Sequence, residues 1–307
     1  MSPSTPCRLA LIGFGEAATT FLKGWPVAAS EVAVFDLKTT VEETAAAMQD
    51  RYRAFGVAGC SSAGEAVRDA PMVVSLVTAD QAVAAAASVA AALMPRALFV
   101  DGNSCNPQSK RKAASIVEES GGRYVDMAIM APVASAGHQT PVLLAGPDAT
   151  EAKERLEQLA MRPQIAGSNV GQASSIKMLR SVMIKGMEAL TAECMLAARK
   201  AGVENEVLAS LQASEKQTDW VRRASYNLER MMVHGVRRAA EMREVAAMID
   251  HLGLPARLSQ AVVDWQEQIG QLHLQGGPDD LADRADRILG DLPERETHNE
   301  PDRNGSL

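Results

Sequence analysis

The stretch "RLALIGFGEAATTFLKGW" (8–25) constrains the fold most, because an apolar run leads directly into two closely spaced glycines. A strand, a glycine turn and a helix in this order form the G-x-G-x-x-G pattern of dinucleotide-binding domains. Gly13 allows the tight turn, and Gly15 leaves room for a pyrophosphate beside the backbone. Ala18 replaces the third glycine, at a position where a methyl group is often tolerated. The stretch is weak evidence alone, so its context decides its meaning.

The next apolar run, "EVAVFD" (31–36), ends in an acidic residue at the distance that the dinucleotide pattern requires. Asp36 is placed to accept hydrogen bonds from the adenosine ribose and to repel a 2′-phosphate, which favours NAD over NADP. Lys38 partly offsets that repulsion. The alternative is a parallel-sheet domain whose glycines only make a turn. We expect a cofactor cradle formed by Gly13, Phe14, Gly15, Glu16, Ala17, Asp36, Lys38, Val77 and Thr78.

Strand-like and helix-like segments alternate through the first half of the chain. The predicted strands are 8–13, 31–36, 72–77, 97–102, 123–130 and 141–146, and helix-length segments at 16–24, 41–50, 62–69 and 79–92 lie between the first four. Such alternation implies βαβ units, and near-continuous apolar strands imply a parallel sheet covered on both faces.

From Ser168 onward the spacing of apolar residues is helical. A helix of about thirty residues is predicted up to Gly202, which is a plausible C-terminal stop. Further helices are expected at 204–230, 236–252 and 256–274. The fold class is therefore α/β, with a Rossmann-type parallel-sheet domain (1–166), an all-helical domain (167–290) and a polar tail (291–307) that we expect to be disordered.

Bulk properties exclude several function classes. A formal net charge of −7 argues against nucleic-acid binding, which needs a basic face. Four scattered cysteines indicate reduced thiols in a cytoplasmic chain, and the N-terminus lacks the features of a signal peptide. The apolar run 82–94 is too short to span a bilayer. The five histidines have no metal-ligand spacing, so no metal is expected.

Two polar segments are candidates for substrate binding. In "DGNSCNP" (101–107), Asn103 and Ser104 follow a strand, where parallel sheets bind ligands, but an Asx or serine turn capping the next helix explains them nearly as well. In "GQASSIKMLRSVMIKGME" (171–188), Lys177 and Arg180 lie one turn apart with Ser181 close by. A lysine facing a closed cleft there has a depressed pKa suited to proton transfer; the alternative is a solvated helix face.

Two further segments carry less specific signals. The small-residue segment 126–146, with Ser135, Gly137 and His138, is either a plain connection or a substrate lid. The segment 230–242 contains His234 among arginines and Glu241. That cluster can bind an anionic substrate, support a dimer contact, or form a surface helix with internal ion pairs.

The order of these motifs resembles the β-hydroxyacid dehydrogenase family, which includes 3-hydroxyisobutyrate and 6-phosphogluconate dehydrogenases. The matching segments, which extend the resemblance to about residue 270, are "IGFGEAA", "DGNSCNP", "DMAIMAP" and "GQASSIKMLRS", and the later helices look like a less-studied phosphogluconate dehydrogenase-like branch. The resemblance implies an NAD(P)-dependent oxidoreductase acting on a 3-hydroxy acid or sugar acid, and a homodimer. Lys177 matches the family lysine that serves as general acid/base.

The sequence departs from the family pattern around the substrate. Methionine, alanine and proline replace a serine and two glycines, arginine and serine replace paired asparagines, and isoleucine replaces a glutamate, at Met130, Ala131, Pro132, Arg180, Ser181 and Ile184. A 6-phosphogluconate substrate is therefore not expected, whereas Arg180 can clamp a carboxylate. The predicted substrate contacts are Asn103, Ser104, Arg180, Ser181 and His234. The alternatives are an imine reductase and a dinucleotide-binding sensor without turnover.

Overall fold

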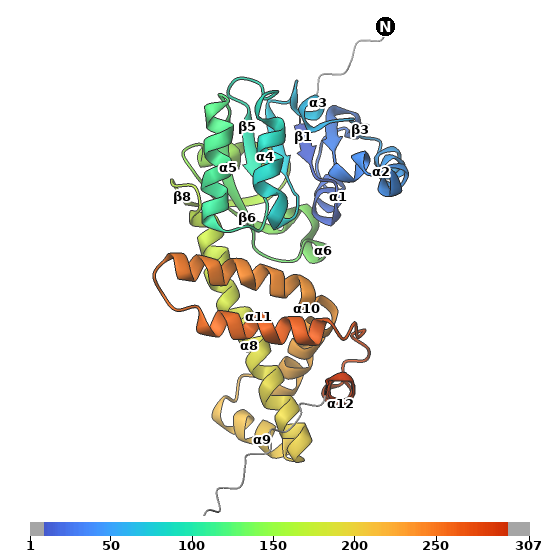
Figure 1. Cartoon of the computed structure of the whole chain (residues 1–307), viewed down its shortest axis with the longest axis vertical. Helices are drawn as coiled ribbons and strands as arrows, with labels where there is room; N and C mark the ends of the chain where they lie inside the picture. The colour runs from blue at the N-terminus through green and yellow to red at the C-terminus, as the bar shows by residue number, and fades with distance from the viewer. Residues whose placement is uncertain (1–8, 294–307) are drawn as a thin grey trace, which may run out of the picture. The chain divides into compact units, whose positions relative to one another are not determined.

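A computed structural model describes residues 9–293 of the protein (Figure 1). The described chain divides into two compact units: a sheet unit of residues 9–182 and 243–257, and a helical unit of residues 183–242 and 258–293. The division cuts through two long helices, whereas the predicted domain boundary at 166/167 falls near the end of the last strand, Arg162–Gly167. Most of the tail predicted from residue 291 lies outside the described residues, as does Cys7.

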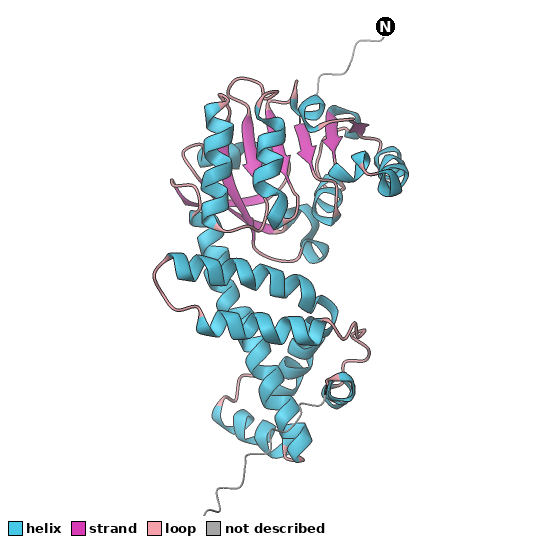
Figure 2. Cartoon of the chain, in the orientation of Figure 1, coloured by secondary structure: helices cyan, strands magenta, loops and turns pink. Residues whose placement is uncertain are grey.

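The sheet unit contains one eight-stranded sheet in the order β3-β2-β1-β4-β5-β6-β7-β8. Its strands are β1 Leu9–Ile12, β2 Val32–Phe35, β3 Ala58–Gly59, β4 Met72–Ser75, β5 Leu98–Asp101, β6 Arg123–Ile129, β7 Pro141–Ala145 and β8 Arg162–Gly167. Its complete helices are α1 Glu16–Leu22, α2 Glu42–Phe55, α3 Ala63–Val67, α4 Ala82–Ala90, α5 Pro107–Glu119, α6 Val133–Ala136 and α7 Ala149–Gln158. Figure 2 shows the strands among these helices, as predicted for a Rossmann-type fold.

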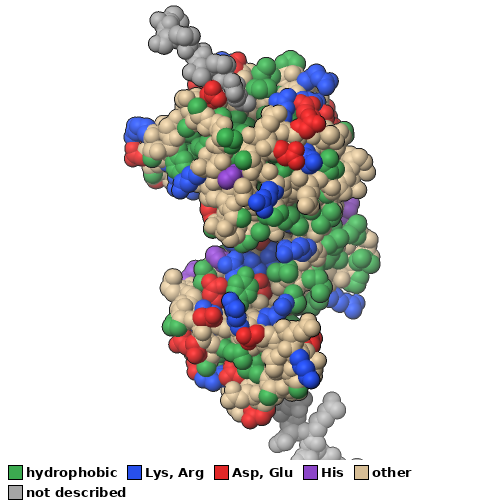
Figure 3. Space-filling view, turned by 180° about the vertical axis from the view of Figure 1, so that it is seen from behind, with side chains coloured by type: hydrophobic (Ala, Val, Ile, Leu, Met, Phe, Trp, Pro, Cys, Tyr) green, Lys and Arg blue, Asp and Glu red, His purple; other side chains and the backbone are tan. Residues whose placement is uncertain are grey.

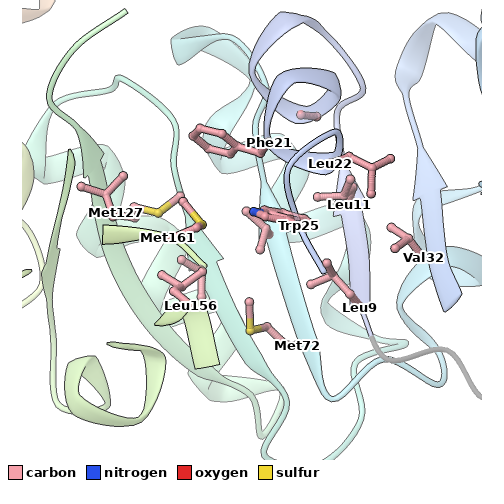
Figure 4. Packing of buried hydrophobic residues seen from close by; sticks show 14 of the residues in the cluster. Leu9, Leu11, Phe21, Leu22, Trp25, Val32, Met72, Met127, Leu156 and Met161 are labelled. Carbon is pink, nitrogen blue, oxygen red and sulfur yellow. The ribbon is translucent and has the colours of Figure 1, made fainter. Parts of the chain in front are cut away.

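The buried strands are apolar on both faces because helices cover both. In β1, Leu9 and Leu11 belong to one core cluster with Phe21 and Trp25 of the α1 region (Figure 4). Ala10 and Ile12 belong to the cluster on the opposite face. Successive residues of a strand point to opposite faces, so two separate cores stabilise the same strand. This rigid sheet positions the loops at its edge.

Two strands run against the parallel prediction: β7 pairs antiparallel with β6, and β8 pairs parallel with β7, so both run opposite to the other six. Residues 130–140 join β6 and β7, and this connection is shorter than the crossover of about a dozen or more residues that a parallel pair requires. It contains only the short helix α6 and a 3-10 turn, Gly137–Gln139. The remaining strand pairs are parallel, including β7 with β8.

The described helical unit is built from α9 Glu204–Ser214, α11 Arg257–Gly270 and α12 Leu281–Asp291, with parts of α8 Gln172–Ala201 and α10 Trp220–His251. The sequence predicted helices at 204–230 and 236–252. The position of the break between them was wrong, because the structure interrupts the helices at residues 215–219, between α9 and α10. Gly235 lies inside α10 without interrupting it. An added Cβ there would overlap the backbone of Gln266 and Gly270. The glycine therefore allows two helices to approach closely.

Among residues 9–293, no helix is both long enough and apolar enough to cross a membrane.

Candidate active site

The glycine turn after β1 has the geometry that the sequence pattern requires. Gly13 has φ +89°, and its N–H donates to the Phe35 carbonyl at 2.8 Å. A Cβ at this position would overlap the carbonyl oxygen of Leu76. The positive φ and the close approach of Leu76 both exclude a side chain, so only glycine fits at position 13.

Gly15 plays a different part, because a Cβ added there meets no atom within 4 Å. Gly15 is the N-cap of α1, and no side chain caps that helix. Glu16 is exposed and Ala17 half-buried in the first turn. Open space beside uncapped backbone N–H groups fits the diphosphate of a dinucleotide, which these residues can hold.

Asp36 links the end of β2 to the glycine turn. Its Oδ2 accepts from the Phe14 N–H at 2.7 Å, and its Oδ1 accepts from the Lys38 N–H at 2.9 Å. The guanidinium of Arg51 donates to the Phe14 carbonyl at 3.2 Å. Each carboxylate oxygen has a further lone pair, so Asp36 can also accept from a ribose hydroxyl.

Asn103, in the loop after β5, forms hydrogen bonds with the end of β4 and with the loop that follows β4. Its Oδ1 accepts from the Val77 N–H at 2.6 Å, and its Nδ2 donates to the Ser75 hydroxyl at 3.0 Å. Asn103 is buried, whereas Thr78 is exposed. Asn103 therefore fixes the loop after β4, where Val77 and Thr78 are predicted cofactor contacts, and its role toward substrate stays a prediction.

Lys177 on α8 meets the loop after β5. Its Nζ donates to the Ser104 hydroxyl at 2.5 Å, and both residues are half-buried. Ser181 donates to the Lys177 carbonyl at 3.1 Å, while Arg180 is exposed. Two segments seventy-three residues apart in sequence thus bring an amine and a hydroxyl together at the edge of the sheet.

A buried charge cluster consists of Asp101 at the end of β5, Lys110 in the first turn of α5 and Asp126 in the middle of β6. Lys110 is 0% exposed, and its Nζ lies 2.9 Å from Asp101 Oδ1 and 3.4 Å from Asp126 Oδ1. Tyr124 donates to Asp101 Oδ2 at 2.6 Å. Burial lowers the pKa of Lys110, but the two carboxylates outweigh it and hold that pKa above its ordinary value. Lys110 therefore stays charged inside the protein.

The sheet unit also includes part of α10. Glu244 Oε2 accepts from the Asn106 side-chain amide at 2.7 Å and from the Asn106 N–H at 3.2 Å. Asn106 in turn caps α5 by accepting from the Ser109 N–H at 2.9 Å. The capping turn proposed for this segment is therefore present, on Asn106, two residues beyond Ser104.

The segment 126–146, considered as a lid, is the β6–β7 connection. His138 packs against the end of α1 so closely that a Cβ on Gly24 would overlap its ring. Thr140 is buried and donates to the Gly137 carbonyl at 2.8 Å. These contacts hold the connection on α1.

In the helical unit, the basic cluster of α10 is largely paired. Arg237 bonds Glu241 at 2.6 Å, and Arg238 bonds Glu188 with an Nε–Oε2 distance of 3.0 Å. His234 is half-buried, and burial together with the charges of Arg230 and Arg237 lowers its pKa. A neutral His234 remains a predicted substrate contact.

Three site features were not predicted: the charge cluster, the Glu244 contact and the position of Arg51. Lys110 carried a readable signal, because it shares helical spacing with the buried Ala113, Ala114 and Val117 of α5. A lysine within an apolar stripe must find buried partners. Its partners on β5 and β6 come from pairing across the sheet, which the local sequence does not show.

Comparison with known proteins identifies the family. The sequence profile described as the NAD binding domain of 6-phosphogluconate dehydrogenase matches residues 8–173, and a domain of unknown function, DUF1932, matches 198–269. The chain belongs to the β-hydroxyacid dehydrogenase family. As a member, it is of the NAD(P)-dependent oxidoreductase class, and a nicotinamide cofactor is the ligand of its N-terminal domain.

Solved structures agree with this family assignment. A conserved hypothetical protein from Sinorhizobium meliloti 1021 is 35% identical, covering 94% of this chain and 98% of its own, with a TM-score of 0.77. A conserved protein of unknown function, described as structurally similar to 3-hydroxyacid dehydrogenases, is 31% identical over 88% of this chain and 100% of its own, with a TM-score of 0.69. Mycobacterium tuberculosis 3-hydroxyisobutyrate dehydrogenase, at 19% identity over 93% of this chain and 99% of its own, shares the fold with a TM-score of 0.71.

Proposed function

We propose that this β-hydroxyacid dehydrogenase transfers a hydride between a 3-hydroxy acid or sugar-acid-like substrate and a nicotinamide cofactor. The observation that carries the proposal is the contact of Lys177 Nζ with Ser104 Oγ at the edge of the sheet. An amine held by a hydroxyl there is suited to exchange a proton with a substrate oxygen. The bound nicotinamide supplies the hydride chemistry, and the protein supplies position and charge.

Each predicted site residue has a distinct task in this proposal. Lys177 takes the proton from the substrate hydroxyl during oxidation and returns it during reduction. Ser104 accepts a hydrogen bond from Lys177 and so orients its amine. Arg180, which is exposed and forms no ion pair with any described residue, is available for a substrate carboxylate. Asn103 and Ser181 support these groups.

The direct test follows the absorbance of reduced nicotinamide while 3-hydroxy acids and sugar acids are supplied with NAD or NADP. Turnover of one of these acids is expected. Turnover of cyclic imines, but of no alcohol, would instead assign the chain to the imine-reductase alternative. Cofactor binding without turnover of any compound would favour a sensor.

Arg180→Ala is expected to raise the KM for an acidic substrate by about tenfold or more, because a charge-assisted hydrogen bond contributes roughly 1.5–3 kcal/mol. Steady-state kinetics of the variant and of Arg68→Ala, an exposed arginine after α3, provide the comparison. An unchanged KM in Arg180→Ala would remove Arg180 from the substrate site.

We propose NAD as the preferred cofactor, supported by the position of Asp36 at the end of β2. Asp36→Asn is expected to weaken NADH binding about tenfold, through loss of a charged acceptor, and to weaken NADPH binding less. Fluorescence titration of both cofactors measures the ratio without any substrate. In Lys38→Gln only NADPH binding should fall. If the ratio of NADH to NADPH affinity is unchanged in Asp36→Asn, Asp36 only stabilises the glycine turn through its bond to the Phe14 N–H.

We also propose a cytoplasmic homodimer. Exposed apolar side chains of the helical unit support the dimer, including Met183 and Leu190 on α8 and Val233 and Val236 on α10. Figure 3 shows apolar side chains among the charged ones on one face of the molecule. Within residues 9–293, Cys60, Cys105 and Cys194 form no disulfide, which suits a reducing compartment.

A further inference from the structure

We propose that Lys110 is a positioning residue that holds Lys177 against Ser104. The inference rests on the proposed role of Lys177 in proton transfer. Lys110 is buried rather than exposed in the site: its side chain is 0% exposed and pairs with Asp101 at the end of β5 and with Asp126 within β6. From this one ammonium, two series of ion pairs and hydrogen bonds lead to the two halves of the Lys177–Ser104 pair.

The first series runs through Asp126 to α8. Lys110 Nζ lies 3.4 Å from Asp126 Oδ1. The same carboxylate accepts hydrogen bonds from the first turn of α8. Asp126 Oδ1 accepts from the Ser174 hydroxyl at 2.6 Å, and Oδ2 accepts from the N–H groups of Ser174 and Gly171 at 3.0 and 3.1 Å. Ser174 precedes Lys177 by less than one helical turn. Asp126 therefore determines where α8 places its lysine.

The second series runs through Asp101 to the loop bearing Ser104. Lys110 Nζ donates to the Asp101 carbonyl at 2.6 Å and to its Oδ1 at 2.9 Å. The same Oδ1 accepts from the Asn103 N–H at 2.9 Å, so the backbone beside Ser104 is bonded to the cluster. Asp101 and Asp126 face each other across paired strands, in register. Lys110 offsets part of the repulsion between the two carboxylates, and it is the residue that the two series of contacts share.

Packing alone does not explain such a cluster. A buried ion group often stabilises a fold no better than apolar side chains of similar volume, because its members must be desolvated. Its hydrogen bonds are directional, however, so they fix two elements at defined separations. Every buried member bonds either the α8 terminus, the loop before α5 or another member; Tyr124, for example, bonds Asp101.

The test compares Lys110→Met with Arg123→Met. Arg123 also pairs with two carboxylates, but it is the first residue of β6, three positions before Asp126, and it bonds Asp148 and Glu151. Lys110→Met is expected to lower kcat by about 100-fold, the order expected for a misplacement of about 1 Å, while KM changes little. Arg123→Met should change neither. Equal losses of kcat in the two variants would overturn the proposal.

A double-mutant cycle shows whether Lys110 acts through Lys177. In a Lys177→Met background, adding Lys110→Met should cause no further loss of turnover, because the group being positioned is already absent. Independent, multiplying losses would contradict the inference. If Lys110→Met does not fold, Ser174→Ala removes one bond of the first series and serves in its place.

A third measurement needs no substrate. Competitive acetylation followed by mass spectrometry gives the labelling rate of Lys177 relative to the exposed Lys112 on α5. In Lys110→Met, or in Ser174→Ala, that ratio should rise several-fold as Lys177 leaves Ser104, and in Arg123→Met it should match the wild type. An unchanged ratio would refute positioning by Lys110. A changed ratio in a chain that turns over no hydroxy acid would refute the proposed function alone.

Discussion

Lys177→Met is expected to lower kcat by about 100-fold to 10,000-fold, the range that a positioned general acid/base contributes. Methionine preserves the length of the side chain but has no proton to exchange. The Nζ of Lys177 bonds Ser104 in the loop after β5, and Lys177 is not part of the predicted cofactor cradle. Binding of NADH should therefore stay close to that of the wild type.

The measurement is steady-state turnover combined with fluorescence titration of NADH. Lys112→Met is the matched control, because Lys112 is exposed on α5 and should tolerate the change. If Lys177→Met keeps the wild-type rate, Lys177 is not the acid/base, and the assignment of the family lysine to this position fails.

Gly235→Ala is expected to lower the free energy of unfolding of the helical unit by about 2 kcal/mol or more, as overpacking does in a tightly packed interior. The α10 backbone at Gly235 lies against α11 at Gln266 and Gly270, and a methyl group would overlap main-chain atoms there. Main chain cannot rotate away as a flexible side chain can. The two helices must separate instead, which removes contacts along the crossing.

Chemical denaturation followed by circular dichroism measures the effect. Gly186→Ala on α8 is the opposite control, because a Cβ there meets no atom within 4 Å. That variant should gain up to about 1 kcal/mol, since alanine favours a helix interior over glycine by that amount. Equal stabilities of Gly235→Ala and the wild type would show that the crossing has room for a methyl group.

The site was predictable where its determinants are close in sequence. Gly13, Gly15 and Asp36 are recognisable because a strand, a turn and a helix of ordinary length place them within one βαβ unit. Lys177 was recognised from its helical spacing and from the family resemblance. Its contact with Ser104 was not predicted, because it depends on how α8 leaves β8 and reaches the loop after β5.

The fold shows the same division. Two helices, 204–230 and 236–252, were predicted with a break at 231–235, where Gly235 lies, and the low helix propensity of glycine agrees with such a break. The structure has a continuous α10, because the absence of a side chain at Gly235 serves a partner helix that is distant in sequence. β7 likewise matched the strand pattern in its residues, but its direction depended on the short connection from β6.

The sequence by itself determined the Rossmann-type sheet, the helical second half and the glycine turn, because periodicity, turn chemistry and helix length act over a few neighbouring residues. Only the tertiary structure decided which charged side chains are buried and what they join. Asp101, Lys110 and Asp126 look ordinary in the chain, and they become one cluster only when β5, β6 and α5 pack together. Burial strengthens electrostatic interactions that would be weak in water, and burial is a property of the whole fold.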